Sequence, residues 1–394
     1  MNTARKSYLF ISRALSSVGA IFLIPVALQI YGEEGWLTIA TLQSLAVMLS
    51  PLVQMHWSKF GGLTILENDI ANVGAIIIKS IVTRLISLTI IVAAAVIILS
   101  FRTDGQEFYL LACSFFAAGS LGLTNEWYYL ARKDFKGLLL KESVPRFILS
   151  TMPLLFLHSV KELTIYFLLC GTGNVLTSFA ILRRFEFSAF STISDPYTFY
   201  EKAKFTAFQF IGFLILFSPV PIVNFFNFAG KFEFTLLERF FRMTMNALLP
   251  ITQIAHSQIL SGENKFSLSR KWYQIGNRLS KVISVAYFPA LMAFLYLTNS
   301  MHTISGSFPL TILFLILIIC TFRNRFLEEI FVLNLKNITL INRMQLLNSG
   351  VLIALMALSI VSRNSFAICG SLIATECART IFMERKIKHA RILR

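Results

Sequence analysis

Apolar blocks, each about 20 residues long, recur from one end of the chain to the other and constrain its fold more than any other feature. A helix needs a block of about this length to cross the hydrocarbon core of a bilayer. The sequence is 56% hydrophobic and only 14% charged, and a water-soluble protein of 394 residues could not bury that much apolar surface. It therefore predicts an all-α integral membrane protein, because helices satisfy their own backbone hydrogen bonds inside lipid.

Counting these blocks predicts about twelve transmembrane helices. Proline lies inside several of them, for example at Pro51 and Pro250. A membrane helix can contain proline because neighbouring helices supply partners for the backbone groups that it frees. The expected spans are residues 9–30, 36–57, 76–99, 108–130, 138–157, 163–182, 205–228, 234–256, 281–297, 309–322, 346–361 and 366–382.

The longest unambiguous connection, Arg183–Lys204, is polar and divides these spans into two sets of six. We therefore expect an N-terminal six-helix bundle over residues 1–190 and a C-terminal six-helix bundle over residues 191–394. A second polar and basic stretch, Ser257–Ser280, is predicted to be a loop. The amphipathic segment 323–337 is expected either to lie along the membrane surface or to extend the tenth helix.

Basic residues indicate the orientation of the chain. Connections that would face the cytoplasm carry most of the lysines and arginines, whereas the opposite turns hold only Arg102, Lys161, Lys231 and Arg363. Cytoplasmic connections are enriched in such residues, so both termini are expected in the cytoplasm. The same bias accounts for the net charge of +16, and nucleic-acid binding is not expected.

Several kinds of chemistry lack a signal in this sequence. No phosphate-binding loop of the G-x-x-x-x-G-K-[ST] type occurs, and the five cysteines and five histidines show no metal-ligand or nucleophile–base spacing. No large connection on the extracytoplasmic side is available to carry catalytic residues. We therefore expect neither an enzyme nor a cofactor or metal site.

Arginines inside the expected spans are the first candidate functional residues, because a charge within a membrane is costly unless it faces a wet or protein-lined interior. Arg13, Arg84 and Arg146 lie at similar depth near the cytoplasmic ends of the first, third and fifth spans. The planar guanidinium suits a pyrophosphate, since it donates two charge-assisted hydrogen bonds. The alternative is that each arginine reaches the interface or pairs with a carbonyl or carboxylate of a neighbouring helix.

Acidic residues within the spans are candidates for ion coupling. Glu238 and Arg242 are spaced i, i+4. Either the two residues form an ion pair on one helix face, or Glu238 exchanges a proton and Arg242 binds an anion. Glu126, at the end of the fourth span, is the second candidate for ion coupling.

An internal repeat is indicated by two similar segments. LSPLVQ occupies residues 49–54 in the second span, and LLPITQ occupies residues 248–253 in the eighth. Both spans are expected to begin on the same side of the membrane, so the sequence predicts two parallel halves.

Three segments resemble those of a known family: YGEEGWLTIATLQSLAVMLSPLVQ (31–54), NEWYYLARKDFKGLLLKESVPRF (125–147) and NFAGKFEFTLLERFFRMTMNALLPITQIAHSQI (227–259). They look like the corresponding parts of Wzx-type flippases, which are related to the MATE exporters. This sequence differs at Leu130 and Ala131, where the family often has Gln-Gly. Its first span also lacks the aspartate of ion-coupled MATE exporters, so no coupling residue is transferred.

The resemblance implies two six-helix bundles around a central cavity. It implies movement of undecaprenyl-pyrophosphate-linked oligosaccharide units between leaflets of the bacterial inner membrane, for O-antigen, lipopolysaccharide or other polysaccharide biosynthesis. The implied partners are the lipid-linked oligosaccharide, the lipid bilayer and other polysaccharide assembly proteins. The alternative is another exporter of the superfamily, for drugs or a different lipid-linked precursor; several arginines within spans favour a diphosphate over a cationic drug.

Overall fold

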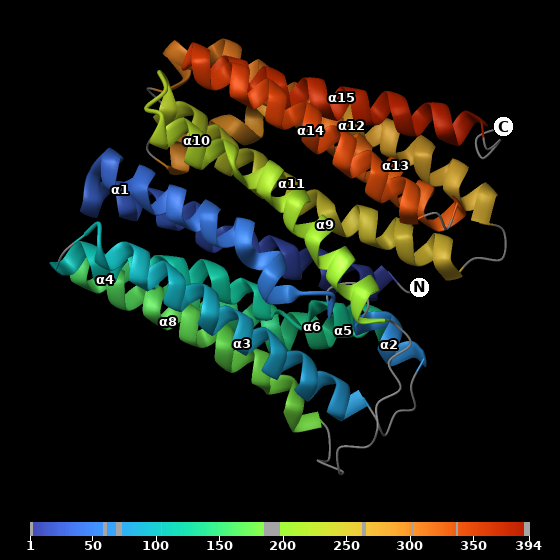
Figure 1. Cartoon of the computed structure of the whole chain (residues 1–394), viewed down its shortest axis with the longest axis horizontal. Helices are drawn as coiled ribbons and strands as arrows, with labels where there is room; N and C mark the ends of the chain where they lie inside the picture. The colour runs from blue at the N-terminus through green and yellow to red at the C-terminus, as the bar shows by residue number, and fades with distance from the viewer. Residues whose placement is uncertain are drawn as a thin grey trace. The chain divides into compact units, whose positions relative to one another are not determined.

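A computed structural model of the chain shows helices joined by turns (Figure 1). Its only pairing of extended backbone among the described residues is an isolated bridge between Ala229 and Asn364, which confirms the expected all-α class. The structure describes residues 3–57, 61–67, 73–103, 105–184, 198–261, 265–298, 300, 303–335 and 338–389.

Two compact units divide the chain, Met1–Pro221 and Ile222–Arg394. The helix that follows the long polar connection packs against the first helix of unit 1 and so belongs to that unit. The two expected six-helix bundles, over residues 1–190 and 191–394, stay a prediction. The helices of unit 1 are α1 (Thr3–Gln54), α2 (Gly62–Glu67), α3 (Val73–Ser100), α4 (Gly105–Gly119), η3 (Ser120–Leu123), α5 (Glu126–Ala131), α6 (Phe135–Leu138), η4 (Leu139–Ser143), α7 (Val144–Thr151), η5 (Met152–Phe156), α8 (Val160–Phe179), η6 (Ala180–Arg184) and α9 (Phe199–Phe217).

Helix α1 is two helices joined at Gly32, and the two parts correspond to the first two expected spans. Gly32 has φ 71° and ψ −178°, a combination that is essentially restricted to glycine. No atom lies within 4 Å of the position that a Cβ would take there. The turn between the two parts of α1 therefore depends on the backbone conformation of Gly32.

The expected fifth span is a series of short helices rather than one regular helix. Pro145 has no N–H to donate to the carbonyl of Lys141, and its ring crowds that carbonyl. The preceding turn, η4, is π-helical, and the N–H of Val144 bonds to the carbonyl of Leu139 instead. This wide turn contains Glu142.

Unit 2 consists mainly of long helices. Helix α10 (Pro219–Phe225) crosses the division and follows a break at Ser218, where two closely spaced prolines interrupt the expected seventh span. The remaining helices are α11 (Lys231–Ser261), α12 (Lys265–Leu297), α13 (Thr303–Leu335), α14 (Ile338–Ser362) and α15 (Ser365–His389).

The prediction of a loop over Ser257–Ser280 was wrong, because α12 is already helical from Lys265. Trp272 stacks on Phe326 of α13, and a Cβ at Gly276 would meet the same ring. A partner on another helix thus covers one face of this basic segment, which hydropathy alone does not show. For the segment after the tenth span, the helix-extension alternative is observed, since α13 continues to Leu335.

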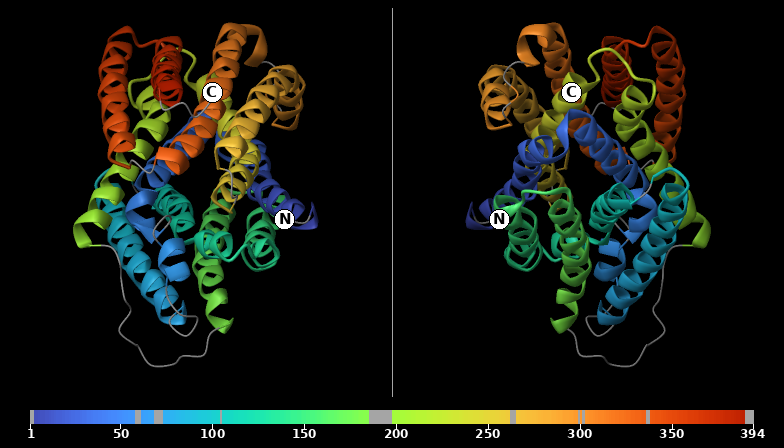
Figure 2. Two further views of the ribbon diagram at one scale, coloured as in Figure 1. Left: turned by 90° about the vertical axis from the view of Figure 1, so that its right-hand side faces the viewer. Right: turned by 90° about the vertical axis from the view of Figure 1, so that its left-hand side faces the viewer.

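Corresponding helices pack against each other in the two units. The most extensive helix contacts join α4 to α8 in unit 1 and α13 to α15 in unit 2 (Figures 1 and 2). Helix α1 contacts α4 as α11 contacts α13. The sequence offset that aligns Pro51 with Pro250 also aligns Asn125 with Asn324, and both asparagines are fully buried. The short repeat seen in the sequence thus has a counterpart inside each unit.

Seven helical segments among the described residues are long and apolar enough to cross a membrane. The chain is therefore a multi-pass membrane protein, and the full count of twelve spans stays a prediction. The segments are Ile21–Gln54, Val73–Ser100, Gly105–Ala131, Val160–Leu182, Ser267–Leu297, Phe308–Leu327 and Ser365–Arg385.

We predict that Gly32→Ala destabilises the protein by about 1–3 kcal/mol, because alanine would be forced into a conformation that glycine adopts without strain. Thermal unfolding of the purified protein in detergent measures the effect. Gly350→Ala in α14 is the matched control, since that site is equally open and has no positive φ. The control should unfold at or slightly above the parent temperature. Equal unfolding temperatures for the two variants would contradict the role of Gly32.

Candidate functional site

The candidate site surrounds a break in the expected fourth span. Helical structure stops after Leu123: Thr124 is extended, with φ −59° and ψ 136°, and α5 begins at Glu126. A break inside a membrane frees backbone polar groups that lipid cannot satisfy. Side chains and carbonyls of three neighbouring elements supply the missing partners, and these groups form the core of the site.

Asn125 is the residue on which these partners converge. Its backbone N–H donates to Oε1 of Glu142 in η4 at 2.8 Å, and its side-chain amide donates to the carbonyl of Ser178 in α8 at 2.8 Å. Its Oδ1 accepts from Nη2 of Arg84 in α3 at 2.6 Å. Asn125 thus joins α3, η4 and α8 at the point where the span is interrupted.

Arg84 is only 1% exposed and uses each of its nitrogens within the protein. Besides the bond to Asn125, its Nη1 donates to the carbonyl of Thr124 at 2.7 Å and its Nε donates to the carbonyl of Ser80 at 3.1 Å. The structure thus places Arg84 in the carbonyl-pairing arrangement that was the alternative to anion binding.

Arg146 is held more loosely than Arg84. Its Nε donates to Oγ1 of Thr177 at 3.3 Å, and its Nη1 lies 3.9 Å from Oε2 of Glu142, beyond hydrogen-bonding distance. Its Nη2 is buried and has no hydrogen-bond partner among the described residues. The side chain as a whole is 17% exposed. Arg146 therefore keeps donor capacity that the protein does not use.

Arg13 completes the site from α1 by forming an ion pair with Glu126. Glu142 interacts electrostatically with Arg146, Arg84 and Arg13. The five charged residues Arg13, Arg84, Glu126, Glu142 and Arg146 are called the arginine cluster below. It brings together three guanidinium groups and two carboxylates, so it carries one excess positive charge.

The remaining predicted site residues lie in unit 2. Glu238 and Arg242 form the ion pair that their spacing indicated, and both are largely buried. Oε2 of Glu238 has no hydrogen-bond partner among the described residues. The structure therefore shows the ion-pair arrangement, and a role for Glu238 in proton exchange stays a prediction.

Asn324 forms the counterpart of the Asn125 contacts in unit 2. Its amide donates to the carbonyl of Glu376 in α15 at 2.7 Å and also bonds to the carboxylate of that residue. Its Oδ1 accepts from Oγ1 of Thr380 at 2.6 Å, and Arg379 lies 3.8 Å from the Glu376 carboxylate. In each unit, a buried asparagine therefore donates to a main-chain carbonyl of the helix that packs most extensively beside it.

Asn125 and Glu142 were not predicted from the sequence. Glu142 could have been found, because it stands four residues before Arg146, the spacing that identified Glu238 and Arg242. Asn125 could not, since its importance depends on a break in the helix that the apolar residues around it conceal.

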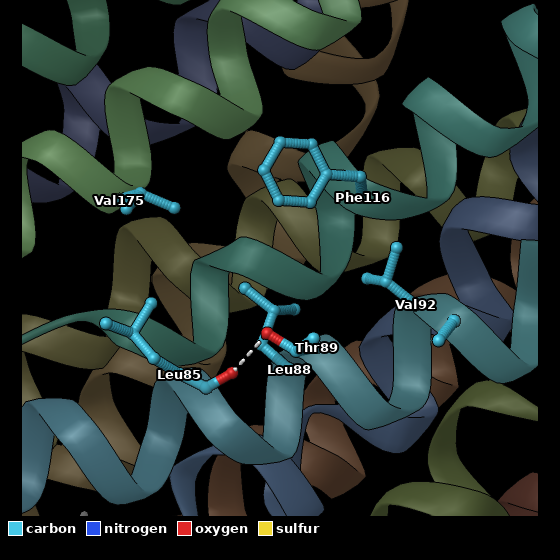
Figure 3. A pocket seen from close by; sticks show the side chains of 7 residues that line it. Leu85, Leu88, Thr89, Val92, Phe116 and Val175 are labelled. Carbon is cyan, nitrogen blue, oxygen red and sulfur yellow. Dashed lines mark hydrogen bonds between the residues drawn. The ribbon is translucent and has the colours of Figure 1, made fainter.

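A separate apolar groove of about 340 Å³ lies between α3, α4 and α8 (Figure 3). Its one polar side chain, Thr89, donates to the carbonyl of Leu85 at 2.9 Å. The groove therefore offers no charge to a ligand and does not contain the arginine cluster. Its lining residues are Leu85, Leu88, Thr89, Val92, Ala93, Phe116 and Val175. Among the described residues, no group of three or more acidic, histidine or cysteine side chains could hold a metal ion.

No family model matches the sequence, and no curated protein matches it. Solved structures of membrane transporters nevertheless match almost the whole chain. A MATE multidrug transporter, DinF-BH, solved in complex with a ligand, is 12% identical with a TM-score of 0.63, over 99% of this chain and 95% of that chain. A mutant of the Vibrio cholerae MATE transporter VcmN is 12% identical with a TM-score of 0.55, over 99% of both chains.

A third similar structure is a MOP superfamily transporter from Pyrococcus furiosus, for which reverse polarity of the binding pocket suggests a different function. It is 13% identical with a TM-score of 0.54, over 98% of this chain and 95% of that chain. At these identities the likeness concerns the fold. The chain is thus a helical membrane protein with the fold of MATE-like transporters, and its assignment to the Wzx-type flippases stays a proposal.

We predict that Arg84→Ala lowers the stability of the protein, because it leaves the Thr124 carbonyl and the Asn125 side chain without their donor. Each unsatisfied buried group costs about 1–3 kcal/mol. Arg84→Lys should restore only part of the loss, since one ammonium cannot reproduce the guanidinium fork. Thermal unfolding in detergent checks this, with Arg102→Ala, at an exposed position in the turn after α3, as control. Parent-like unfolding of Arg84→Ala would refute the assigned role.

Proposed function

We propose that the protein is a flippase that moves undecaprenyl-pyrophosphate-linked oligosaccharide repeat units from the cytoplasmic to the periplasmic leaflet by alternating access. The likeness to MATE and MOP superfamily transporters over almost the whole chain supports transport rather than catalysis. The arginine cluster lies among the helices of unit 1, and its excess positive charge supports an anionic substrate. No cofactor enters the proposal.

The donor of Arg146 that has no partner among the described residues is the observation that favours a pyrophosphate-linked substrate. A pyrophosphate linked at both ends bears two negative charges, and the arginine cluster has one excess positive charge in a site from which water is largely excluded. The side chain of Arg146 is partly exposed, and a guanidinium can bind such a group through charge-assisted hydrogen bonds. Arg13, which is also 17% exposed, is the proposed second contact.

The other candidate residues take supporting roles in this proposal. Arg84 holds the backbone at Thr124 and Asn125 so that the cluster keeps its shape. Arg242 is proposed to contact the substrate from unit 2, and Glu238 and Glu126 are the proposed ion-coupling residues.

The proposed setting follows from the charge bias and the resemblance described in the sequence. The chain would lie in the bacterial inner membrane with both termini in the cytoplasm. Two six-helix bundles would enclose a central cavity. The lipid-linked oligosaccharide, the bilayer and other polysaccharide assembly proteins would be its partners.

A second candidate function is export of drugs or of another lipid-linked precursor. It is favoured by the similarity to DinF-BH, a multidrug transporter that was solved with a ligand bound. The arginine cluster argues against a cationic substrate, because an excess of positive charge repels cations from a site of low dielectric constant.

We predict that Arg146→Ala weakens binding of a pyrophosphate-linked lipid by about ten- to a hundredfold, because it removes a charged hydrogen bond worth about 1.5–3 kcal/mol. Arg146→Lys should recover only part of the affinity, since it keeps the charge but not the fork. Transport of a polyprenyl-diphosphate oligosaccharide into reconstituted vesicles measures the effect. Lys161→Ala, at an exposed position in the first turn of α8, is the control.

Membrane levels of these variants must match the parent. Full transport by Arg146→Ala at matched levels would contradict the proposed role of Arg146. Movement of the cationic dye ethidium by the parent, with no movement of the lipid-linked oligosaccharide, would favour the second candidate function.

A further prediction concerns Glu238 in unit 2. If Glu238 exchanges a proton during transport, Glu238→Gln should reduce the transport rate and flatten its pH dependence, while protein abundance stays normal. Glu233→Gln on the same helix is the matched control. An unchanged rate and pH profile would leave Glu238 only its ion pair with Arg242.

A further inference from the structure

Glu142 occupies an unusual position in the arginine cluster. It is 2% exposed and lies in the π-helical turn η4, a conformation that is frequent at functional sites. One carboxylate oxygen accepts the N–H of Asn125, whereas the other stops 3.9 Å short of Arg146. Its carboxylate is therefore anchored at one oxygen and only loosely paired at the other.

Arginines of three different helices interact electrostatically with Glu142. Arg13 approaches from α1, Arg84 from α3 and Arg146 from α7. Glu126 of α5 forms an ion pair with Arg13, and each nitrogen of Arg84 donates to a group of the protein. Arg146 thus combines a donor that the described residues leave unused with a carboxylate partner that it does not bond.

A diphosphate that binds Arg146 must compete with Glu142 for the same guanidinium. Both are anions, and they would be placed close together in a site of low dielectric constant, where like charges repel strongly. Two acidic groups that share such a site favour a state in which one of them is neutral. A diphosphate diester has no proton to gain near neutral pH, so the carboxylate of Glu142 is the group that takes up a proton.

We propose that Glu142 accepts one proton from solvent when a diphosphate binds at Arg146 and returns it when the diphosphate leaves. Glu142 goes from carboxylate to carboxylic acid, and no other bond is made or broken. The proposal rests on the anion site of the proposed function. It identifies Glu142 as the residue that makes anion binding at this site depend on pH. Its anchor can survive the change, since the uncharged form retains an oxygen to accept from Asn125.

The linkage has a definite sign. Because the bound anion favours protonated Glu142, protonated Glu142 equally favours the anion. Affinity for the diphosphate therefore rises as pH falls, by up to tenfold per pH unit for one proton. At high pH the proton is too scarce to be taken up, and affinity levels off at a weaker value.

Calorimetry of the full-length protein in detergent tests this, with P1,P2-dimethyl diphosphate as the probe. Titrations in two buffers of different ionisation heat count the protons taken up on binding. We expect close to one proton for the parent and none for Glu142→Gln. That variant keeps the acceptor for Asn125 but cannot ionise, so its affinity should be independent of pH and at least as tight as the parent's. Glu33→Gln, exposed in α1, should behave as the parent.

Each outcome decides between alternatives. Binding by the parent without proton uptake overturns the role of Glu142, and so does undiminished uptake by Glu142→Gln. If that variant does not fold, the proton count of the parent still tests the proposal, because binding without proton uptake overturns it. Absence of binding by the parent overturns this proposal and the anion site together. Proton-linked binding without lipid transport in vesicles overturns the flippase alone, whereas transport with pH-independent binding overturns this inference alone.

Discussion

A helix that breaks within a membrane must find protein partners for the backbone groups it frees, and unit 1 depends on how this requirement is met. At the break, a guanidinium donates to the carbonyl of Thr124 and a carboxylate accepts the backbone N–H of Asn125, while the Asn125 side chain donates to a main-chain carbonyl of a third element. These charged partners cannot be left uncompensated in a dry interior, so further charges gather around them. Structural need and proposed function thus draw on the same residues.

The two units solve a similar packing problem with different charges. Asn125 and Asn324 are both buried, and each donates to a main-chain carbonyl of a neighbouring helix, α8 in unit 1 and α15 in unit 2. These two helices take part in the most extensive helix contact of their units. Around Asn125 the charges sum to one excess cation. Beside Asn324, the carboxylate of Glu376 lies 3.8 Å from Arg379. The asparagine contacts therefore belong to the shared scaffold, and the charges around them are where the two units differ.

The sequence was sufficient for features that depend on composition and local spacing. Hydropathy placed the apolar parts of the helices, and the i, i+4 spacing of Glu238 and Arg242 indicated their ion pair. Contacts between distant segments could not be predicted in this way. The pairing of Arg13 with Glu126 joins two helices that are far apart in sequence, and the helical start of α12 depends on Phe326 of another helix. The break before Asn125 was hidden because an apolar stretch looks the same whether or not its backbone is continuous.

The π-helical turn that holds Glu142 has a consequence for how this helix tolerates changes of length. A π turn closes its hydrogen bond over one residue more than an α turn does, so η4 contains a residue that a regular helix would not need. Loss of one residue there could be absorbed by a return to α-helical geometry, with the helical ends on either side kept in register. The separation of the carboxylate from Arg146 could thus be altered by a deletion, without exchanging either charged residue.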